Sequence, residues 1–190
     1  YFVKRYLCGP VVTEDKIAEA KEVLDNHMGP GHFNLEGWEH ILNEHGGKLP
    51  ISIKAVPEGS IVPTRCCLLT VVNTDPKCYW LTNYLETLLV QVWYPMTVCT
   101  HSREQKKVIK HFLEKSADPG SFLVGFKLHD FGFRGVSSVE SAAIGGAGHL
   151  VNFLGTDTMA ALLCAKNYYA AEGAAGFSIP AAEHSTISSW

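Results

Sequence analysis

The stretch that decides the fold is VGFKLHDFGFRGVSS, residues 124–138. It begins with Val124–Leu128, an apolar run of strand length. Near its end stands Ser137, which together with Glu140 has the pattern of a capping box that starts a helix. Between the two lies HDFGFRG, residues 129–135, which is polar and rich in glycine. A strand, a polar loop and a capped helix in this order are typical of a βα unit.

The same order recurs twice toward the C-terminal end of the sequence. We expect further strands at about Leu150–Phe153 and Phe177–Ile179, and helices from about Val139 to Gly148 and from about Thr158 to Ala171. This alternation predicts a parallel sheet covered by helices, either wound open or closed into a barrel. The glycines within residues 145–148 lack the spacing of a phosphate-binding loop, so we interpret them as a site of close helix packing.

The first hundred residues have a different pattern. Thr13 is the expected N-cap of a helix that stops at Gly29. The further elements that we predict here are a helix at about Leu35–Glu44, strands at Ile51–Val56 and Cys67–Val72, a helix at Tyr79–Trp93 buried on several sides and ended by Pro95, and a helix from the capping box of Ser102 and Gln105 to about Lys115. We therefore predict a smaller α+β domain over residues 1–100 and the first part of an α/β domain over residues 101–190.

Composition excludes several classes of protein. With 46% hydrophobic residues the chain can bury a core, and its formal net charge of −3 gives no general attraction to nucleic acid or to an anionic membrane. No apolar run approaches the roughly 20 residues that span a bilayer, so we expect neither a membrane nor a nucleic acid as partner. The six cysteines include no C-x-x-C pair and no histidine partners at zinc-finger spacing, which favours a reduced, cytoplasmic protein.

Ionisable and aromatic residues follow each of the three predicted βα strands. Phe131 and Arg134 come after the first strand, Asp157 after the second and His184 after the third. Because the carboxyl ends of parallel strands share one edge of a sheet, where ligands bind, we expect these four residues to form one active site.

Each of these residues also has a purely structural interpretation. Asp157 suits the N-cap of the following helix, His184 suits an ordinary loop histidine, and Phe131 suits the core. Arg134 stands one residue before a glycine at a sheet edge, which suits bidentate binding of an oxyanion or phosphate. His129 and Asp130 have no second ligand pair at metal spacing, so we predict no metal bound by protein side chains.

Three motifs at the predicted strand ends, HDFGFRGVSS (129–138), NFLGTDT (152–158) and IPAAEHST (179–186), closely resemble those of the nicotinamide phosphoribosyltransferases. IKAVPEG, NTDPKCYWLTN, WYPMTV and SREQKK extend the resemblance over essentially the whole chain. It implies a type II phosphoribosyltransferase fold, which is an irregular α/β barrel beside a smaller α+β domain, in a homodimer with active sites at the subunit interface. Because the chain opens at Tyr1 and closes at Trp190, we expect an internal segment that contains part of the barrel and is inactive alone.

The resemblance also implies a reaction, that of a glycosyltransferase of the pentosyltransferase class in NAD biosynthesis. Nicotinamide and phosphoribosyl pyrophosphate would give nicotinamide mononucleotide and pyrophosphate, coupled to hydrolysis of ATP as co-substrate, with Mg²⁺ held mainly by substrate phosphates. Phe131 would stack on the pyridine ring, and Asp157 would accept a hydrogen bond from the carboxamide and repel nicotinate. Arg134 would contact oxyanionic groups, and His184 would be phosphorylated by ATP.

Two other functions stay open. A nicotinate phosphoribosyltransferase shares the fold and the chemistry, although Asp157 argues against it because its charge repels an acid. A non-catalytic, secreted signalling factor is the alternative from another class. Such an interaction protein has no reason to keep Phe131, Arg134, Asp157 and His184 at one sheet edge, whereas an enzyme requires it.

Overall fold

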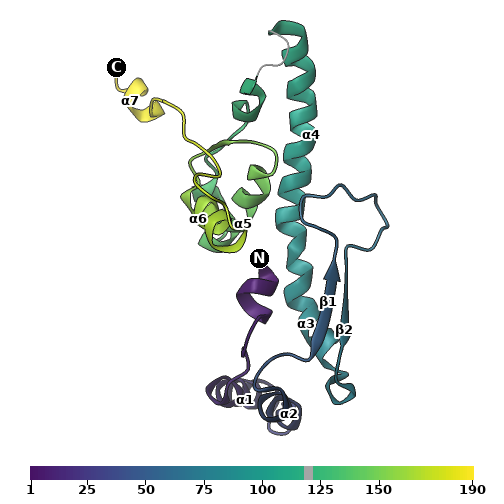
Figure 1. The fold of residues 1–190 in the computed structure, drawn as a ribbon. Coiled ribbons are helices and arrows are strands. Elements are labelled where there is room, and N and C mark those ends of the chain that lie inside the picture. The colour runs from purple at the N-terminus through teal and green to yellow at the C-terminus, as the bar shows by residue number, and fades with distance from the viewer. Residues whose placement is uncertain (118–121) are drawn as a thin grey trace. The chain divides into compact units, whose positions relative to one another are not determined.

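The computed structural model describes residues 1–117 and 122–190, which form two units (Figure 1). Unit 1 comprises Tyr1–Gln91 and unit 2 comprises Val92–Trp190. The sequence places the domain boundary at residues 100 and 101, a few residues later along the chain. Within the described ranges, no helix combines the length and the apolarity that crossing a bilayer requires.

Unit 1 contains helices and one antiparallel pair of strands. Its elements are the π-helix η1 (Val3–Leu7), α1 (Glu14–Met28), α2 (Leu35–His45), β1 (Ile51–Ala55), β2 (Leu69–Asn73), the 3₁₀ helix η2 (Pro76–Cys78) and α3 (Leu81–Leu89), followed by the 3₁₀ turn η3 (Val90–Val92) that leads into unit 2. The predicted N-cap of α1 is confirmed, because the Thr13 hydroxyl accepts a hydrogen bond from the Lys16 amide. The predicted α2 and both predicted strands are present, with bounds shifted by one or two residues.

The two glycines after α2 end the helix and let the chain turn back. Gly46 adopts the left-handed conformation, and its N–H donates to the Ile41 carbonyl. Gly47 has φ of +76°, and a Cβ there would lie 2.3 Å from the Val12 carbonyl oxygen. Only glycine fits this approach, so the chain between α2 and β1 is fixed against the segment before α1.

The core of unit 1 is apolar. Its buried members come from the stretch before α1 and from α1, α2, η2 and α3, and are Val12, Ile17, Ile41, Cys78, Leu81, Leu85 and Leu89. The spacing of the three leucines places them on one face of α3, whereas Tyr84 of the same helix is 54% exposed. The prediction of a helix at Tyr79–Trp93 that is buried on several sides was therefore wrong, since α3 is shorter and buries one stripe.

Unit 2 alternates helices with very short strands. Its elements are α4 (Trp93–Ser116), the 3₁₀ helix η4 (Phe122–Phe126), β3 (His129–Asp130), the 3₁₀ turn η5 (Phe133–Gly135), α5 (Val139–Leu150), β4 (Gly155–Thr156), α6 (Met159–Tyr168) and α7 (His184–Ser188). Pro95 does not end a helix as predicted but lies in the first turn of α4, where a missing N–H costs nothing. Ser102 is not a cap either, because it is a buried residue within α4.

Helix α5 packs closely against both α4 and α6, and its glycines permit this. A Cβ on Gly146 would lie 2.5 Å from the Ala161 Cβ of α6, and one on Gly148 would lie 2.7 Å from the Pro95 carbonyl of α4. The prediction that residues 145–148 serve helix packing is confirmed. The cap of α5 is Ser138, which accepts a hydrogen bond from the Ser141 amide, so the predicted capping box of Ser137 and Glu140 was off by one residue.

The predicted βα strands lie elsewhere than expected. The apolar run Val124–Leu128 is largely 3₁₀ helix, and the strand β3 begins only at His129. The segment predicted as the strand Leu150–Phe153 begins as the last residue of α5, and the amides of Asn152 and Phe153 both donate to the His149 carbonyl. Short apolar runs do not distinguish a strand from a buried turn, which explains both errors.

The parallel arrangement itself is present. Strands β3 and β4 pair in parallel, with His129 opposite Gly155 and Asp130 opposite Thr156. Phe177 adds a single parallel bridge to Gly155 in place of the predicted strand Phe177–Ile179. The chain is thus a mixed helix and strand protein with parallel βα organisation in unit 2.

Candidate functional site

The candidate site of unit 2 lies at the carboxyl ends of its parallel strands. Phe131 follows β3 and Asp157 follows β4, so both residues leave the pair at the same edge. The Asp157 amide donates to the Asp130 carbonyl at 2.7 Å, which joins the two loops where they begin. The Asp130 carboxylate in turn accepts from the Gly132 amide at 2.9 Å and shapes the turn after β3.

Asp157 is held by one side chain from each neighbouring segment. Ser178 donates its hydroxyl to Oδ1 at 2.5 Å, and the His129 Nε2 lies 2.9 Å from Oδ2. The hydrogen bond from Ser178, followed by the contact with His129, lowers the pKa of the Asp157 carboxyl. The carboxylate side chain is still 51% exposed, so a negative charge is fixed in position and open to a ligand.

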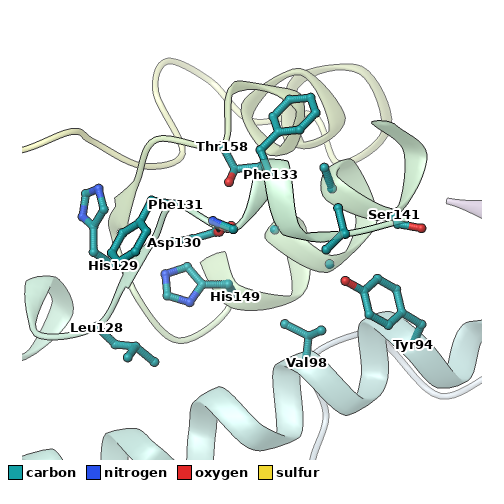
Figure 2. Close-up of a pocket in the computed structure, with 15 residues that line it drawn as sticks. Tyr94, Val98, Leu128, His129, Asp130, Phe131, Phe133, Ser141, His149 and Thr158 are labelled. Atoms are coloured by element: carbon teal, nitrogen blue, oxygen red, sulfur yellow. Dashed lines mark hydrogen bonds between the residues drawn. The ribbon is translucent and has the colours of Figure 1, made fainter. Parts of the chain in front are cut away.

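A pocket of about 330 Å³ opens beside this edge (Figure 2). Its walls are the loop from His129 to Phe133, the facing side of α5 and the first turns of α4. The Phe131 ring lies nearly parallel to the His129 ring, with 6.1 Å between centroids and 29° between planes, and it is 71% exposed. An exposed aromatic ring at the mouth of a pocket is suited to stacking on a flat ligand.

His149 forms part of the pocket wall from α5. It is 5% exposed, stacks on Phe153 with 5.3 Å between centroids, and lies with Nε2 2.9 Å from the Gly155 carbonyl oxygen. Burial lowers the pKa of its imidazole, although the Gly155 carbonyl and the charge of Asp130 act in the opposite direction. Burial thus favours the neutral imidazole, and the ring supports β4 through its contact with the Gly155 carbonyl.

The four residues predicted from the sequence do not all lie at the pocket. Phe131 lines the pocket, and Asp157 is linked to it through His129. Arg134 is exposed in η5 and, among the described residues, its guanidinium makes no ion pair. His184 is the first residue of α7, 87% exposed, with Nε2 3.1 Å from Glu183 Oε1. Within the described part of the chain, neither Arg134 nor His184 is among the residues that line the pocket.

The structural alternatives for two of these residues are excluded. Asp157 is not the N-cap of α6, because Thr158 holds that position. Phe131 is not a core residue, as its exposure shows. In α7 the cap is Glu183, whose carboxylate accepts from the Ser185 amide.

Sequence reasoning missed Ser178 and His149. Ser178 directly follows the third parallel segment, as Asp157 follows the second, and this shared position was the available signal. His149 gave a misleading signal, because a histidine in the last turn of a helix is usually a charged partner of the helix dipole. Its burial by α5 and Phe153 depends on tertiary packing that no local pattern reveals.

Comparison with known families gives two matches along the chain. Residues 1–53 match the model of the nicotinamide phosphoribosyltransferase N-terminal domain. Residues 126–190, which contain the candidate site, match the nicotinate phosphoribosyltransferase (NAPRTase) family. The second model carries the name of the acid rather than of the amide.

Curated relatives carry the name nicotinamide phosphoribosyltransferase. One from Xanthomonas campestris pv. campestris is 55% identical over 179 residues, which is 94% of this chain and 38% of the relative. One from Acinetobacter baylyi is 40% identical over 90% of this chain and 34% of the relative, and one from Mycoplasma pneumoniae is 32% identical over 76% and 34%. The chain thus spans less than two fifths of the length of these relatives. With both matched regions and these identities, the chain belongs to the nicotinamide phosphoribosyltransferase family.

Proposed function

We propose that this chain is part of an enzyme that transfers a phosphoribosyl group to nicotinamide and so forms nicotinamide mononucleotide for NAD biosynthesis. The observation that carries the proposal is the fixed carboxylate of Asp157 beside the exposed ring of Phe131, at the carboxyl edge of parallel strands. The names of the relatives support the same reaction. We further propose the irregular α/β barrel, the homodimer with sites at its interface and the cytoplasmic location that the family resemblance implies.

Nicotinamide would be bound by its ring and by its carboxamide. Phe131 stacks on one face of the electron-poor pyridine ring, and an aromatic residue of a second subunit covers the other face. The carboxamide NH₂ donates to Asp157, whose remaining lone pairs are accessible because the side chain is half exposed. The lowered pKa of Asp157 keeps it ionised at neutral pH, so nicotinate would meet a like charge.

In the transfer itself, the pyridine nitrogen attacks C1 of phosphoribosyl pyrophosphate. The bond from C1 to nitrogen forms as the bond from C1 to the pyrophosphate oxygen breaks, and pyrophosphate leaves with that electron pair. Arg134 is exposed and suited to bind the oxyanions of the substrate. The carboxylates of Asp130 and Asp157 are engaged by Gly132, Ser178 and His129, so Mg²⁺ would be held mainly by the phosphates.

ATP would act through His184. A ring nitrogen of neutral His184 attacks the terminal phosphorus of ATP, ADP leaves, and hydrolysis of the phosphorylated ring later returns the histidine and inorganic phosphate. The ring is accessible to a nucleotide, since it is 87% exposed. The adjacent Glu183 contacts one ring nitrogen, which leaves the other nitrogen available for attack.

The test of substrate choice is the substitution Asp157→Asn in the full-length protein. We expect the preference for nicotinamide over nicotinate, measured as the ratio of the two kcat/KM values, to fall about 10- to 100-fold because the charge that repels the acid is gone. Glu172→Gln, which removes an exposed carboxylate elsewhere in unit 2, is the matched control. An unchanged ratio in Asp157→Asn, or a wild-type enzyme that prefers nicotinate, would contradict the proposal.

The test of ATP coupling is His184→Ala in the same protein. It should abolish ATP hydrolysis and the incorporation of acid-labile phosphate from labelled ATP. Synthesis of the nucleotide without ATP should persist if His184 serves coupling alone, and should be lost as well if the residue also holds pyrophosphate. Normal ATP hydrolysis with label still on the protein would return His184 to the role of a loop residue.

A further inference from the structure

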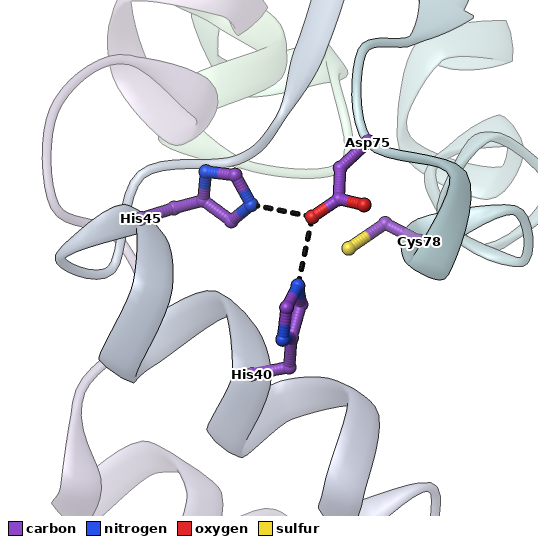
Figure 3. Close-up of side chains that lie close together, drawn as sticks. All are labelled: His40, His45, Asp75 and Cys78. Atoms are coloured by element: carbon purple, nitrogen blue, oxygen red, sulfur yellow. Dashed lines mark hydrogen bonds and ion pairs between the residues drawn. The ribbon is translucent and has the colours of Figure 1, made fainter.

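Unit 1 contains a cluster of four potential metal ligands, whereas the four residues assigned to the proposed reaction belong to unit 2. The cluster consists of His40 and His45 from α2, Asp75 before η2, and Cys78 at the end of η2 (Figure 3). One ligand atom from each residue lies within 4.8 Å of the other three. Both histidines point their Nε2 atoms at Asp75 Oδ2, at 2.7 and 2.8 Å.

The local folding explains why these side chains converge. Asp75 and Cys78 are three residues apart in a 3₁₀ turn closed by the Cys78 amide on the Asp75 carbonyl, and residues at that spacing lie on the same side of the turn. The Lys77 amide donates to Asp75 Oδ1 at 2.9 Å, which orients the carboxylate and leaves Oδ2 to face the histidines. A backbone group that orients a ligating oxygen in this way is typical of built metal sites.

The surroundings of the cluster also favour a bound ion. Cys78 is fully buried in the core of unit 1, yet its sulfur faces Asp75 and the histidines (Figure 3). Within the described residues this sulfur makes no hydrogen bond. The side chains of His40, His45 and Asp75 are 18%, 31% and 17% exposed, so the ligand atoms are held inside the unit while an ion can still enter from solvent.

The spacing of the four residues fits zinc as well. His40 and His45 are separated by four residues, within the H-x₃₋₅-H range of zinc sites, and Asp75-x-x-Cys78 has the spacing of a C-x-x-C pair with aspartate in the first position. We predicted no metal bound by protein side chains, because the cysteines include no C-x-x-C pair and no histidine partners at zinc-finger spacing, and because His129 and Asp130 have no second ligand pair. The spacing of His40 and His45 corrects the second of these grounds. The carboxylate in place of one cysteine hid the pattern.

We propose that His40, His45, Asp75 and Cys78 bind one Zn²⁺ ion in a closed, tetrahedral structural site. The two imidazoles bind through Nε2, the carboxylate through Oδ2 and the sulfur as thiolate, while the Cys78 thiol proton passes to solvent. One carboxylate and one thiolate balance the charge of the ion, so the occupied site is neutral. Tetrahedral zinc separates its ligand atoms by about 3.3 to 3.7 Å, so the histidines move about half an ångström away from Asp75.

The first experiment uses Co²⁺ as a spectroscopic probe on the full-length protein, prepared without a histidine tag and stripped with a chelator. We expect one tightly bound cobalt ion per chain, with the near-ultraviolet charge-transfer band of a cobalt–thiolate bond, displaced by one equivalent of Zn²⁺. Zn²⁺ should also raise the melting temperature of the stripped protein, because it binds the folded state only. Absence of a stoichiometric, thiolate-containing site would overturn the proposal.

Variants then assign the site. Cys78→Ser should remove the charge-transfer band, and His45→Gln should weaken zinc binding at least about 100-fold. The double variant Cys66→Ser and Cys67→Ser removes two exposed thiols and should leave both properties unchanged. His45 lies at the end of α2 and is the most exposed of the four, so its variant should still fold, as circular dichroism can verify. A band that survives in Cys78→Ser, or equal zinc affinity in His45→Gln, would contradict the assignment.

Discussion

The two units of the chain bury different kinds of surface. Unit 1 is held by branched and aromatic side chains that fill a continuous apolar core around Ile41 and Leu81. Unit 2 buries small residues where α5 meets its neighbours, and all the buried polar side chains in the described ranges belong to it, namely Ser102, His149, Thr156 and Thr158. One unit is thus stabilised by apolar volume, and the other by close backbone approach and internal hydrogen bonds.

This difference indicates why the candidate active site is in unit 2. Polar groups such as those at the ends of β3 and β4 must be positioned accurately, and short strands joined by side-chain hydrogen bonds do this without a large apolar core. Unit 1 has the larger apolar core, and its candidate polar site is the cluster of His40, His45, Asp75 and Cys78. Three substitutions test the contrast, from the largest expected effect to the smallest.

The largest effect is expected from Ile41→Ala. This side chain is fully buried, so its truncation should lower the free energy of unfolding of unit 1 by about 2 to 5 kcal/mol. Fluorescence of the contacting pair Trp38 and Trp80 reports unfolding of this unit in urea. Val23→Ala on the exposed side of α1 is the control, with an expected change of about 0.5 kcal/mol or less. If Ile41→Ala also altered the preference between nicotinamide and nicotinate, the division of roles between the units would be wrong.

A smaller loss is expected from Gly146→Ala in α5. Helix propensity alone would make alanine stabilising by about 1 kcal/mol. The new Cβ, however, would lie 2.5 Å from the Ala161 Cβ, and neither atom can move without its backbone, so we expect a net loss of about 1 to 3 kcal/mol. The double variant Gly146→Ala and Ala161→Gly should recover part of this loss in urea unfolding. A more stable single variant would show that α5 and α6 are not packed at this distance.

The smallest effect is expected on the pH dependence of unfolding, through the protonation of His149. The folded state keeps this ring neutral by burial, whereas the unfolded chain titrates near the ordinary value of 6.5. Below pH 6.5 the unfolded state binds one more proton than the folded state, so the free energy of unfolding falls as the pH falls. Above pH 6.5 this part of the stability is retained. Urea unfolding of the full-length protein at pH 7.5 and at pH 5.5 should show a smaller pH dependence in His149→Gln than in the wild type. His27→Gln, at the exposed end of α1, should keep the full dependence.

Elements with strong local signals could be predicted from the sequence. Thr13 before two acidic residues gave the start of α1, and the alternation in Ile51–Ala55 gave β1. In unit 2 the first two strands and the helices that follow them occur in the predicted order, but β3 and β4 lie several residues away from the predicted positions, and the third predicted strand is only a single bridge at Phe177. Strands of two residues have no periodicity, so their positions are set by contacts such as that of the Leu154 amide with the Gly125 carbonyl.

The candidate site shows a similar limit. The position of Asp157 and Phe131 after successive strands was visible in the sequence, because polar residues interrupt the apolar runs there. Whether Arg134 and His184 join them stays a prediction. Two residues orient Asp157, namely His129 and Ser178. They come from two other segments of the chain, so their contacts with Asp157 depend on tertiary structure.

If Asp157 sets substrate choice as we propose, its two neighbours also bear on how that choice can change during evolution. A new residue at this position must satisfy the Ser178 hydroxyl and the His129 ring together, which excludes most single substitutions. Asparagine is an exception, because its oxygen can accept from Ser178 while its amide donates to the other tautomer of His129. Because of His129, the single substitution Asp157→Asn can remove the negative charge proposed to repel an acid and still keep both contacts at this edge of the sheet.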